Sequence, residues 1–329
     1  MARIQILTQQ EIKEFEQVPL FKYKEKTHIF SLPKILNDAT QSFQNDSYFL
    51  IFTLLFGYFK ITNKFYDDTF YYESDIEFVT DKYNLQNINH IKLPRKTIYR
   101  YKQLIREYFK INDYTEDIKS ILQKEANNLA NNFIHRKKIF YTLVNLSKKL
   151  NIEVPSYTEL TRIIQAALNT QKKDILEKLE PLQEDERLKL LDEFLEKEEE
   201  SKNRYKIAYF RKLEHSTAKN QMLLSLGKLD TIKSKFSILK EIIENVGITP
   251  KIAHYYAKWV EKGQTSQINQ TNTLNQKFTL LSFVYYQYLI RNDNLIDRFI
   301  STVQTAKNSS FRAQKDFIAI LNQTTTKIR

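Results

Sequence analysis

The residues with the clearest chemical meaning are cations gathered on one predicted helix. Between Lys92 and Lys110 the chain has seven Lys or Arg residues and a single acid, Glu107. At about 100° per residue, the apolar side chains form one stripe and most of the cations lie on the opposite face. A helix that is held by its apolar face and offers cations outward fits the groove of a polyanion. The alternative is a solvated lysine-rich surface. The apolar stripe consists of Ile98, Tyr101, Ile105, Tyr108 and Phe109.

Three groups of residues are therefore candidates for contact with nucleic acid. The first comes from the basic helix, whose outward face is expected to carry Arg95, Tyr99, Lys102, Gln103, Arg106 and Lys110. The contact candidates on this helix are Arg95, Lys96, Thr97, Tyr99, Arg100, Gln103, Arg106 and Lys110. The second comes from the starts and ends of other expected helices: Arg136, Lys137, Lys138, Ser156, Thr158, Arg162, Lys60, Asn63 and Lys64. The third, in the basic C-terminal part, is Lys233 and Lys235. Substituting Arg100 or Arg106 by Ala is expected to weaken DNA binding by about 1–3 kcal/mol where base edges are read.

Other chemistry finds little support in the residue types. The chain has no cysteine, so disulfides and thiolate chemistry are excluded. Its five histidines show no ligand spacing, and we expect no metal and no cofactor. Carboxylates could hold metal ions for phosphodiester cleavage, and the local candidates are Asp67-Asp68 and Glu184-Asp185-Glu186. Adjacent carboxylates of this kind are usually surface groups. Trp259, on an expected helix with two tyrosines, could stack on a base, but core packing is the favoured interpretation.

The overall charge favours an acidic partner. The net charge is +12 over 329 residues, with a segment of opposite sign between Glu177 and Glu200. Nucleic acid is favoured over a membrane surface because the longest apolar run, Tyr48 to Phe59, is too short to span a bilayer. No polybasic amphipathic terminus is visible. The first residues lack the features of a signal peptide, so we expect a cytoplasmic protein without a membrane partner.

The expected fold class is all-α and multi-domain, with tandem helix-turn-helix-like units followed by a helical bundle. Only four glycines occur, which leaves no glycine-rich phosphate loop and few turns for sheets. Thr8–Glu11, Ser74–Glu77 and Ser156–Glu159 have the spacing of capping boxes at helix starts. Helices are expected near 8–17, 32–44, 47–59, 75–83, 86–91, 96–110, 115–131, 134–150, 157–169, 171–179, 183–214, 218–228, 230–246, 250–261, 274–291 and 294–306.

Four blocks follow from these patterns. Residues 1–70 are an aromatic-rich helical unit, and residues 71–180 are a second unit that contains the basic helix. Residues 181–201 are an acidic, solvated helical connector, and residues 202–329 form a third, basic domain. In the second block, a helix ending near Tyr83, a short helix around Ile88 and the basic helix have the outline of a helix-turn-helix.

Several stretches, taken in order, resemble the Tn-three family of bacterial transposases, which move class II transposons replicatively. The opening Met1 to Thr8 with Glu11 resembles the start of that family. The resemblance continues over most of the chain in four further stretches: Arg95 to Arg106 with Tyr108, Glu153-Val154-Pro155 with Glu159-Leu160, Ile238 to Gly247 with Pro250, and Phe278 to Phe283 leading to Asp293 to Asp297.

The resemblance implies a DNA-binding region with tandem helix-turn-helix units that grip the terminal inverted repeats of the transposon. In that family an RNase-H-like domain near the C-terminus carries two aspartates and a glutamate for transposition and DNA recombination. The resemblance does not extend to that domain, so we expect no catalytic residue here and a role in binding rather than catalysis.

Other classes of function stay open. The chain could be an interaction module that inhibits full-length transposase through mixed dimers formed by residues 202–329, with itself or that transposase as its partner. It could also be an RNA-binding protein or an unrelated helical scaffold. An enzyme is the least favoured interpretation.

Overall fold

The computed structural model describes residues 5–40, 43, 45–67, 71–86, 88, 93–133, 135–198 and 201–327, without the side chains of 39, 133, 201–203 and 321–327. The expected helix near 86–91 lies largely outside these residues, as do Lys92, Asp68 and His90. The chain forms two compact units, Met1–Gln171 and Lys172–Arg329. Helices dominate both, and the predicted all-α fold is confirmed.

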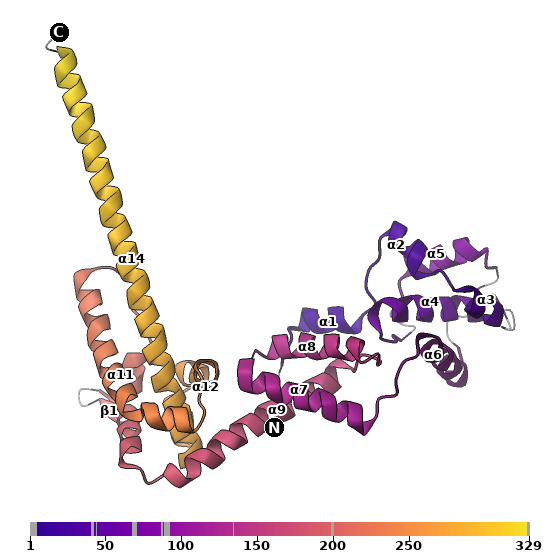
Figure 1. The fold of residues 1–329 in the computed structure, drawn as a ribbon, viewed down its shortest axis with the longest axis horizontal. Coiled ribbons are helices and arrows are strands. Elements are labelled where there is room, and N and C mark those ends of the chain that lie inside the picture. The colour runs from indigo at the N-terminus through magenta and orange to yellow at the C-terminus, as the bar shows by residue number, and fades with distance from the viewer. Residues whose placement is uncertain are drawn as a thin grey trace. The chain divides into compact units, whose positions relative to one another are not determined.

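The first unit is built entirely of helices in its described part (Figure 1). Its core forms around α4, and residues on both sides of the boundary expected at residue 70 contribute to it. The helices are α1 (Gln9–Glu16), α2 (Tyr23–Ile29), α3 (Lys34–Thr40), α4 (Asp46–Thr62), α5 (Glu73–Tyr83), α6 (Arg95–Phe109), α7 (Glu116–Phe133), α8 (Arg136–Lys149) and α9 (Tyr157–Leu179), the last of which continues into the second unit.

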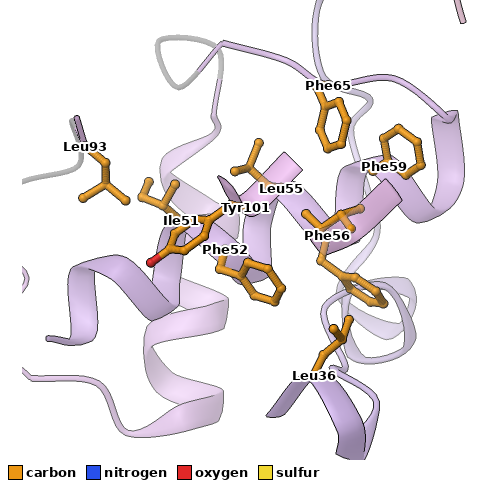
Figure 2. Packing of buried hydrophobic residues seen from close by; sticks show 10 residues of the cluster. Leu36, Ile51, Phe52, Leu55, Phe56, Phe59, Phe65, Leu93 and Tyr101 are labelled. Carbon is orange, nitrogen blue, oxygen red and sulfur yellow. The ribbon is translucent and has the colours of Figure 1, made fainter. Parts of the chain in front are cut away.

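Helix α4 is the centre of this unit because apolar side chains surround it. Asn45 caps its start, with the side chain accepting from the Tyr48 N–H, and the left-handed residue Asn63 ends it. One face of α4 packs with Tyr101 and Ile105 of α6, and the other with Phe30 and residues of α5. Figure 2 shows the first of these clusters, in which side chains of α4 pack around Tyr101 and Phe65. A buried helix of this kind fixes how α6 presents its outer face.

A second group of helices, α1, α7, α8 and α9, completes the first unit. The expected capping box at Thr8 and Glu11 is present at the start of α1. At α9 only half of the box forms, because Ser156 accepts from the Glu159 N–H while the Glu159 carboxylate binds Arg162. The box expected at Ser74 is absent, and the Ser74 hydroxyl instead accepts a hydrogen bond from Lys26.

The second unit consists of helices packed on α14. Helices α11 and α12 lie along α14, and the apolar segment Phe278–Val284, which the sequence predicts to be buried, is in this core. The elements are η2 (Glu180–Leu182), η3 (Glu186–Leu195), β1 (Lys197–Glu198), β2 (Ser201–Tyr205), α10 (Ile207–Phe210), α11 (Lys219–Asn245), α12 (Pro250–Lys262), α13 (Thr265–Asn269) and α14 (Thr273–Lys327).

The acidic segment differs from its predicted form. A single helix over 183–214 is wrong, because the chain forms the 3-10 helix η3 and then the antiparallel pair β1–β2. Leu188, Leu191 and Phe194 of η3 are buried in the second unit rather than exposed as in a solvated connector. Their spacing of three residues suits a 3-10 helix, in which side chains at i and i+3 lie one above the other.

Helix α14 is the longest element, and its C-terminal part extends past the other helices of the second unit (Figure 1). In its first part Arg291 is fully buried, donating to the Phe210 carbonyl at 2.6 Å and lying 3.5 Å from the Glu214 carboxylate. From Phe299 to Ile320 every residue is exposed. The two shorter helices predicted here, 274–291 and 294–306, are one continuous helix.

Candidate nucleic-acid interface

Helix α6 forms as the sequence predicts and is oriented by its apolar stripe. Pro94 precedes it, and no acid occurs in its first turn. Tyr101 and Ile105 are fully buried against α4, while Phe109 packs at the margin and stacks on Phe56 with ring centroids 5.3 Å apart. Lys110 ends the helix in the left-handed conformation, with φ of 52°. The opposite face is therefore turned to solvent.

The solvent-facing side of α6 carries cations that lack an acidic partner. Arg95, Lys96, Arg100 and Lys110 are exposed, and within the described part of the chain none has a carboxylate within ion-pair distance. Tyr99 stands among them with 68% of its surface exposed. Because an unpaired, hydrated cation releases counterions on meeting a phosphate, this face suits a nucleic-acid backbone. We call Arg95, Lys96, Tyr99, Arg100, Gln103 and Lys110 the basic face.

The other side chains of α6 are less available. Lys102 is half-buried, with its amino group 5.2 Å from the centroid of the Phe65 ring. Arg106 lies 5.3 Å from the same centroid and forms an ion pair of 2.7 Å with Glu153. Gln103 is exposed but donates to Glu107 at 3.0 Å. Thr97, a predicted contact, is half-buried.

The predicted contacts at the start of α8 interact within the chain. Lys137 forms an ion pair with Glu11, whose pKa is lowered by the hydrogen bond from Lys137. Arg136 is half-buried and Lys138 is exposed, and each has an interaction with a neighbouring group. Their charges are thus less available than those of the basic face.

The predicted contacts at the start of α9 are exposed. Ser156 accepts from the Glu159 N–H, and Thr158 faces solvent beside it. Arg162 binds Glu159 at 2.7 Å, yet 69% of its side chain is exposed. A pair this open competes poorly with a phosphate, so Arg162 keeps a capacity for contact.

The three candidates at the end of α4 serve the fold instead. Lys60 donates to the His28 carbonyl at 2.8 Å, and burial lowers its pKa. Asn63 is the left-handed cap of α4. Lys64 is 8% exposed, donates to the Phe15 carbonyl at 2.9 Å and lies 3.2 Å from Glu16. A buried cation that is bound in this way is less available to a duplex, and the DNA contact expected of Lys64 stays a prediction.

The third group of candidates, Lys233 and Lys235, and the acidic cluster Glu184-Asp185-Glu186 belong to the second unit. Lys233 on α11 is exposed, whereas Lys235 is bound to Glu193. Asp185 caps η3 and binds Arg187 at 2.7 Å, and Glu186 pairs with Lys189. In the part of the chain that the structure describes, no three His, Asp or Glu side chains are grouped to hold a metal ion. Over the same residues, no helix is long and apolar enough to cross a bilayer.

Sequence reasoning missed a polar junction at the C-terminal end of α6. The segment from Asn151 to Val154, between α8 and α9, is hydrogen-bonded to the ends of both α4 and α6. Asn63, Lys110 and Asn151 all have positive φ there, near 50°. Asparagine after a helix was a visible signal for a left-handed cap, but nothing in the sequence showed that the three caps lie within one contact network.

A family profile matches the part of the chain that contains the basic face. Residues 6–167 match the sequence profile of a family described as a domain of unknown function, DUF4158. The match covers nearly all of the first unit, including α6 and the junction. None of the curated proteins matches the chain.

Proposed function

We propose that this chain binds double-stranded DNA through the basic face of α6. The observation that carries the proposal is that the exposed cations of this helix have no acidic partner among the described residues, although the chain pairs many of its other cations. The surface also lies on a helix whose inner side is fixed by a close-packed aromatic core. A rigid helix that offers cations and amides is suited to a major groove.

Within this proposal, phosphate contacts supply affinity and a few side chains supply sequence preference. Arg95, Lys96 and Lys110 neutralise phosphates, which fixes the register of the helix on the duplex. Arg100 and Gln103 are the side chains that suit guanine and adenine edges, respectively. Tyr99 adds an exposed aromatic ring beside them.

The target that we propose is the terminal inverted repeat of a transposon, with the chain acting as the DNA-recognition part of a Tn-three-like transposase. This rests on the resemblance of several ordered stretches to that family. Two helices that pack on α4, namely α5 and α6, support a helix-turn-helix arrangement with α6 as the recognition helix. Binding, with no catalytic step, is the activity proposed for this chain.

Fluorescence anisotropy on duplex DNA at two salt concentrations tests the proposal. Arg100→Ala should weaken binding by about 1–3 kcal/mol where it reads a base, or lower the salt slope by about one where it binds a phosphate. Arg312→Ala, which removes the same charge from an exposed position on α14, is the control and should have little effect. Equal behaviour of the two variants would exclude α6 from the interface, and equally effective competition by double-stranded RNA would favour an RNA-binding protein.

A second function, self-association, is favoured by α14. Its exposed part carries large apolar side chains at heptad spacing, where the a and d positions of a coiled coil fall. These seam positions are Ile296, Phe299, Val303, Ala306, Ser310, Ala313, Phe317 and Ile320. Five of the eight are large apolar residues with between 51% and 66% of their surface exposed.

The partner that we propose for this seam is a second copy of the chain. In a parallel, in-register pair, Lys307 would face Thr302 of the partner subunit, and Ser309 would face the partner's Gln314, so no like charges would meet across the seam. Small residues in the middle of the seam allow close approach. A mixed dimer with a full-length transposase would use the same surface.

A further inference from the structure

We propose that Glu153 is a positioning residue for DNA binding. Its contact with Arg106, together with the hydrogen bonds of Asn151, holds α6 in the orientation that lets the basic face and Arg162 at the start of α9 engage one duplex. The inference rests on the proposed function. It assigns a role to Glu153, a negatively charged residue beside the proposed DNA-binding surface of α6.

The contact between Arg106 and Glu153 joins two segments that are far apart in sequence. The Arg106 Nη2 atom lies 2.7 Å from Glu153 Oε2, and the two side chains are 27% and 33% exposed. A charge-assisted bond of this length is directional. It ties the last turn of α6 to the extended segment that leads into α9.

Hydrogen bonds to backbone carbonyls beside this ion pair strengthen the connection. The Asn151 amide nitrogen Nδ2 donates to the carbonyls of Phe109 and Lys110, at 3.1 and 2.7 Å. In return, Asn112 donates from its backbone to the Asn151 carbonyl at 2.8 Å and from its side chain to the Leu150 carbonyl at 2.9 Å. The last carbonyls of α6 and α8 thus obtain partners that a helix end otherwise lacks.

The same segment also binds the end of α4. The Val154 N–H donates to the Asn63 carbonyl at 2.8 Å, and the following residue, Lys64, is held by Phe15 and Glu16 at the end of α1. Tyr157 at the start of α9 also donates its N–H to Glu16, at 3.0 Å. Residues 151–154 therefore join the end of α6 to the start of α9, in addition to the core that holds α6 against α4.

The charge of Glu153 makes the role testable. When this carboxylate is removed, an electrostatic effect alone predicts higher affinity for DNA, whereas a positioning role predicts lower affinity. A carboxylate close to the DNA-binding surface repels phosphates, so its removal should tighten binding if it only contributed charge. Removing it also frees Arg106 as an additional cation. A positioning role predicts weaker binding, since two groups of contacts no longer meet one duplex in the correct geometry.

The experiment compares Glu153→Gln with Glu107→Gln in the full chain. Both variants remove one negative charge near α6, but Glu107 is exposed, and among the described residues its side chain binds only Gln103 of its own helix. We expect Glu107→Gln to tighten duplex binding slightly and Glu153→Gln to weaken it about fivefold or more. The charge-exchanged variant Arg106→Glu with Glu153→Arg has the net charge of the original chain. It should bind more tightly than Glu153→Arg alone, although that single variant carries two more positive charges.

Tighter binding by Glu153→Gln, in step with Glu107→Gln, would overturn the inference. A second measurement needs no DNA: hydrogen exchange at the backbone of Lys110 to Asn112 should speed up in Glu153→Gln and not in Glu107→Gln. If the original chain shows no salt-dependent DNA binding, the proposed function fails, and unchanged exchange in Glu153→Gln would independently disprove the positioning role.

Discussion

At the scale of single residues, Arg100 and Arg106 carry the same charge on one helix but differ in how available they are for DNA contact. Arg100 is exposed and has no acidic partner in the described part of the chain, whereas Arg106 is bound to Glu153 and lies over Phe65. Neutralising a bound cation by substitution also leaves Glu153 unpaired. The two substitutions to Ala should therefore differ: the loss at Arg100 reflects DNA contact, and that at Arg106 reflects the orientation of α6.

Tyr101 provides a pH-dependent prediction. Its ring is fully buried, and its hydroxyl has no hydrogen-bond partner among the described residues. Burial raises the pKa of Tyr101 from 10.0 to about 12, against a smaller lowering by the neighbouring Arg100 guanidinium. Since the unfolded chain loses this proton at lower pH than the folded chain, the stabilisation is complete below pH 10 and is lost as the pH rises toward 12, by about 3 kcal/mol at most.

Tyr101→Phe tests this dependence. The variant should be about as stable as the original at neutral pH, because an unbonded hydroxyl contributes little when it is removed. In strongly alkaline solution it should lose less free energy of unfolding than the original chain. Urea unfolding at the two pH values measures the difference, and an equal alkaline loss in both proteins would contradict the prediction.

At the scale of elements, two helical glycines predict opposite effects of the same substitution. A Cβ atom at Gly57 of α4 would lie 2.3 Å from Phe30 Cδ1, whereas one at Gly227 of α11 would have no atom within 4 Å. Alanine favours a helix over glycine by about 1 kcal/mol. Gly227→Ala should therefore stabilise the chain by about 0.5–1 kcal/mol, and Gly57→Ala should destabilise it by about 1–3 kcal/mol because the core is overpacked. Urea denaturation followed by circular dichroism measures the free energy of unfolding of both variants. A change of the same sign in the two would contradict the close packing of Gly57 against Phe30.

The strongly periodic elements could be predicted from the sequence. The apolar stripe of α6 and the continuous apolar run of α4 placed both helices to within a few residues of their observed bounds. The solvent exposure of Arg95, Tyr99, Gln103 and Lys110 also followed from the helical period. Lys102 and Arg106, expected on the same face, are half-buried because both lie over the Phe65 ring. Periodicity shows which face of a helix is turned outward, and for the basic face that was the decisive property.

Features that depend on distant partners could not be predicted. Helix α2 was missed because its sequence is polar, and it is anchored by Lys26, which lies 2.7 Å from the buried Asp75 of α5. Lys64 looked like an exposed cation at a helix end, but its partners are Phe15 and Glu16 at the end of another helix. A single sequence gives no indication of which acid meets which cation across the fold.

At the scale of the whole molecule, the exposed seam of α14 predicts association. The mass measured by light scattering should rise toward that of a dimer as concentration increases. Val303→Asp places a charge at a seam position and should weaken association about tenfold or more, because that charge would be desolvated between the helices. Asn308→Asp adds the same charge at an outer position of the heptad and should leave the mass unchanged. A mass that stays monomeric at all concentrations would remove self-association from the proposals.

The chain's only tryptophan makes its two units optically distinguishable. Trp259 lies on α12 in the second unit and is 40% exposed, whereas the first unit contains tyrosine and phenylalanine as its only aromatic residues besides histidine. Indole emission excited at the red edge of the aromatic band therefore reports on residues 172–329 alone. A duplex that binds to α6 should leave the tryptophan emission unchanged. Any shift in its wavelength or change in its intensity would reveal a response in residues 172–329.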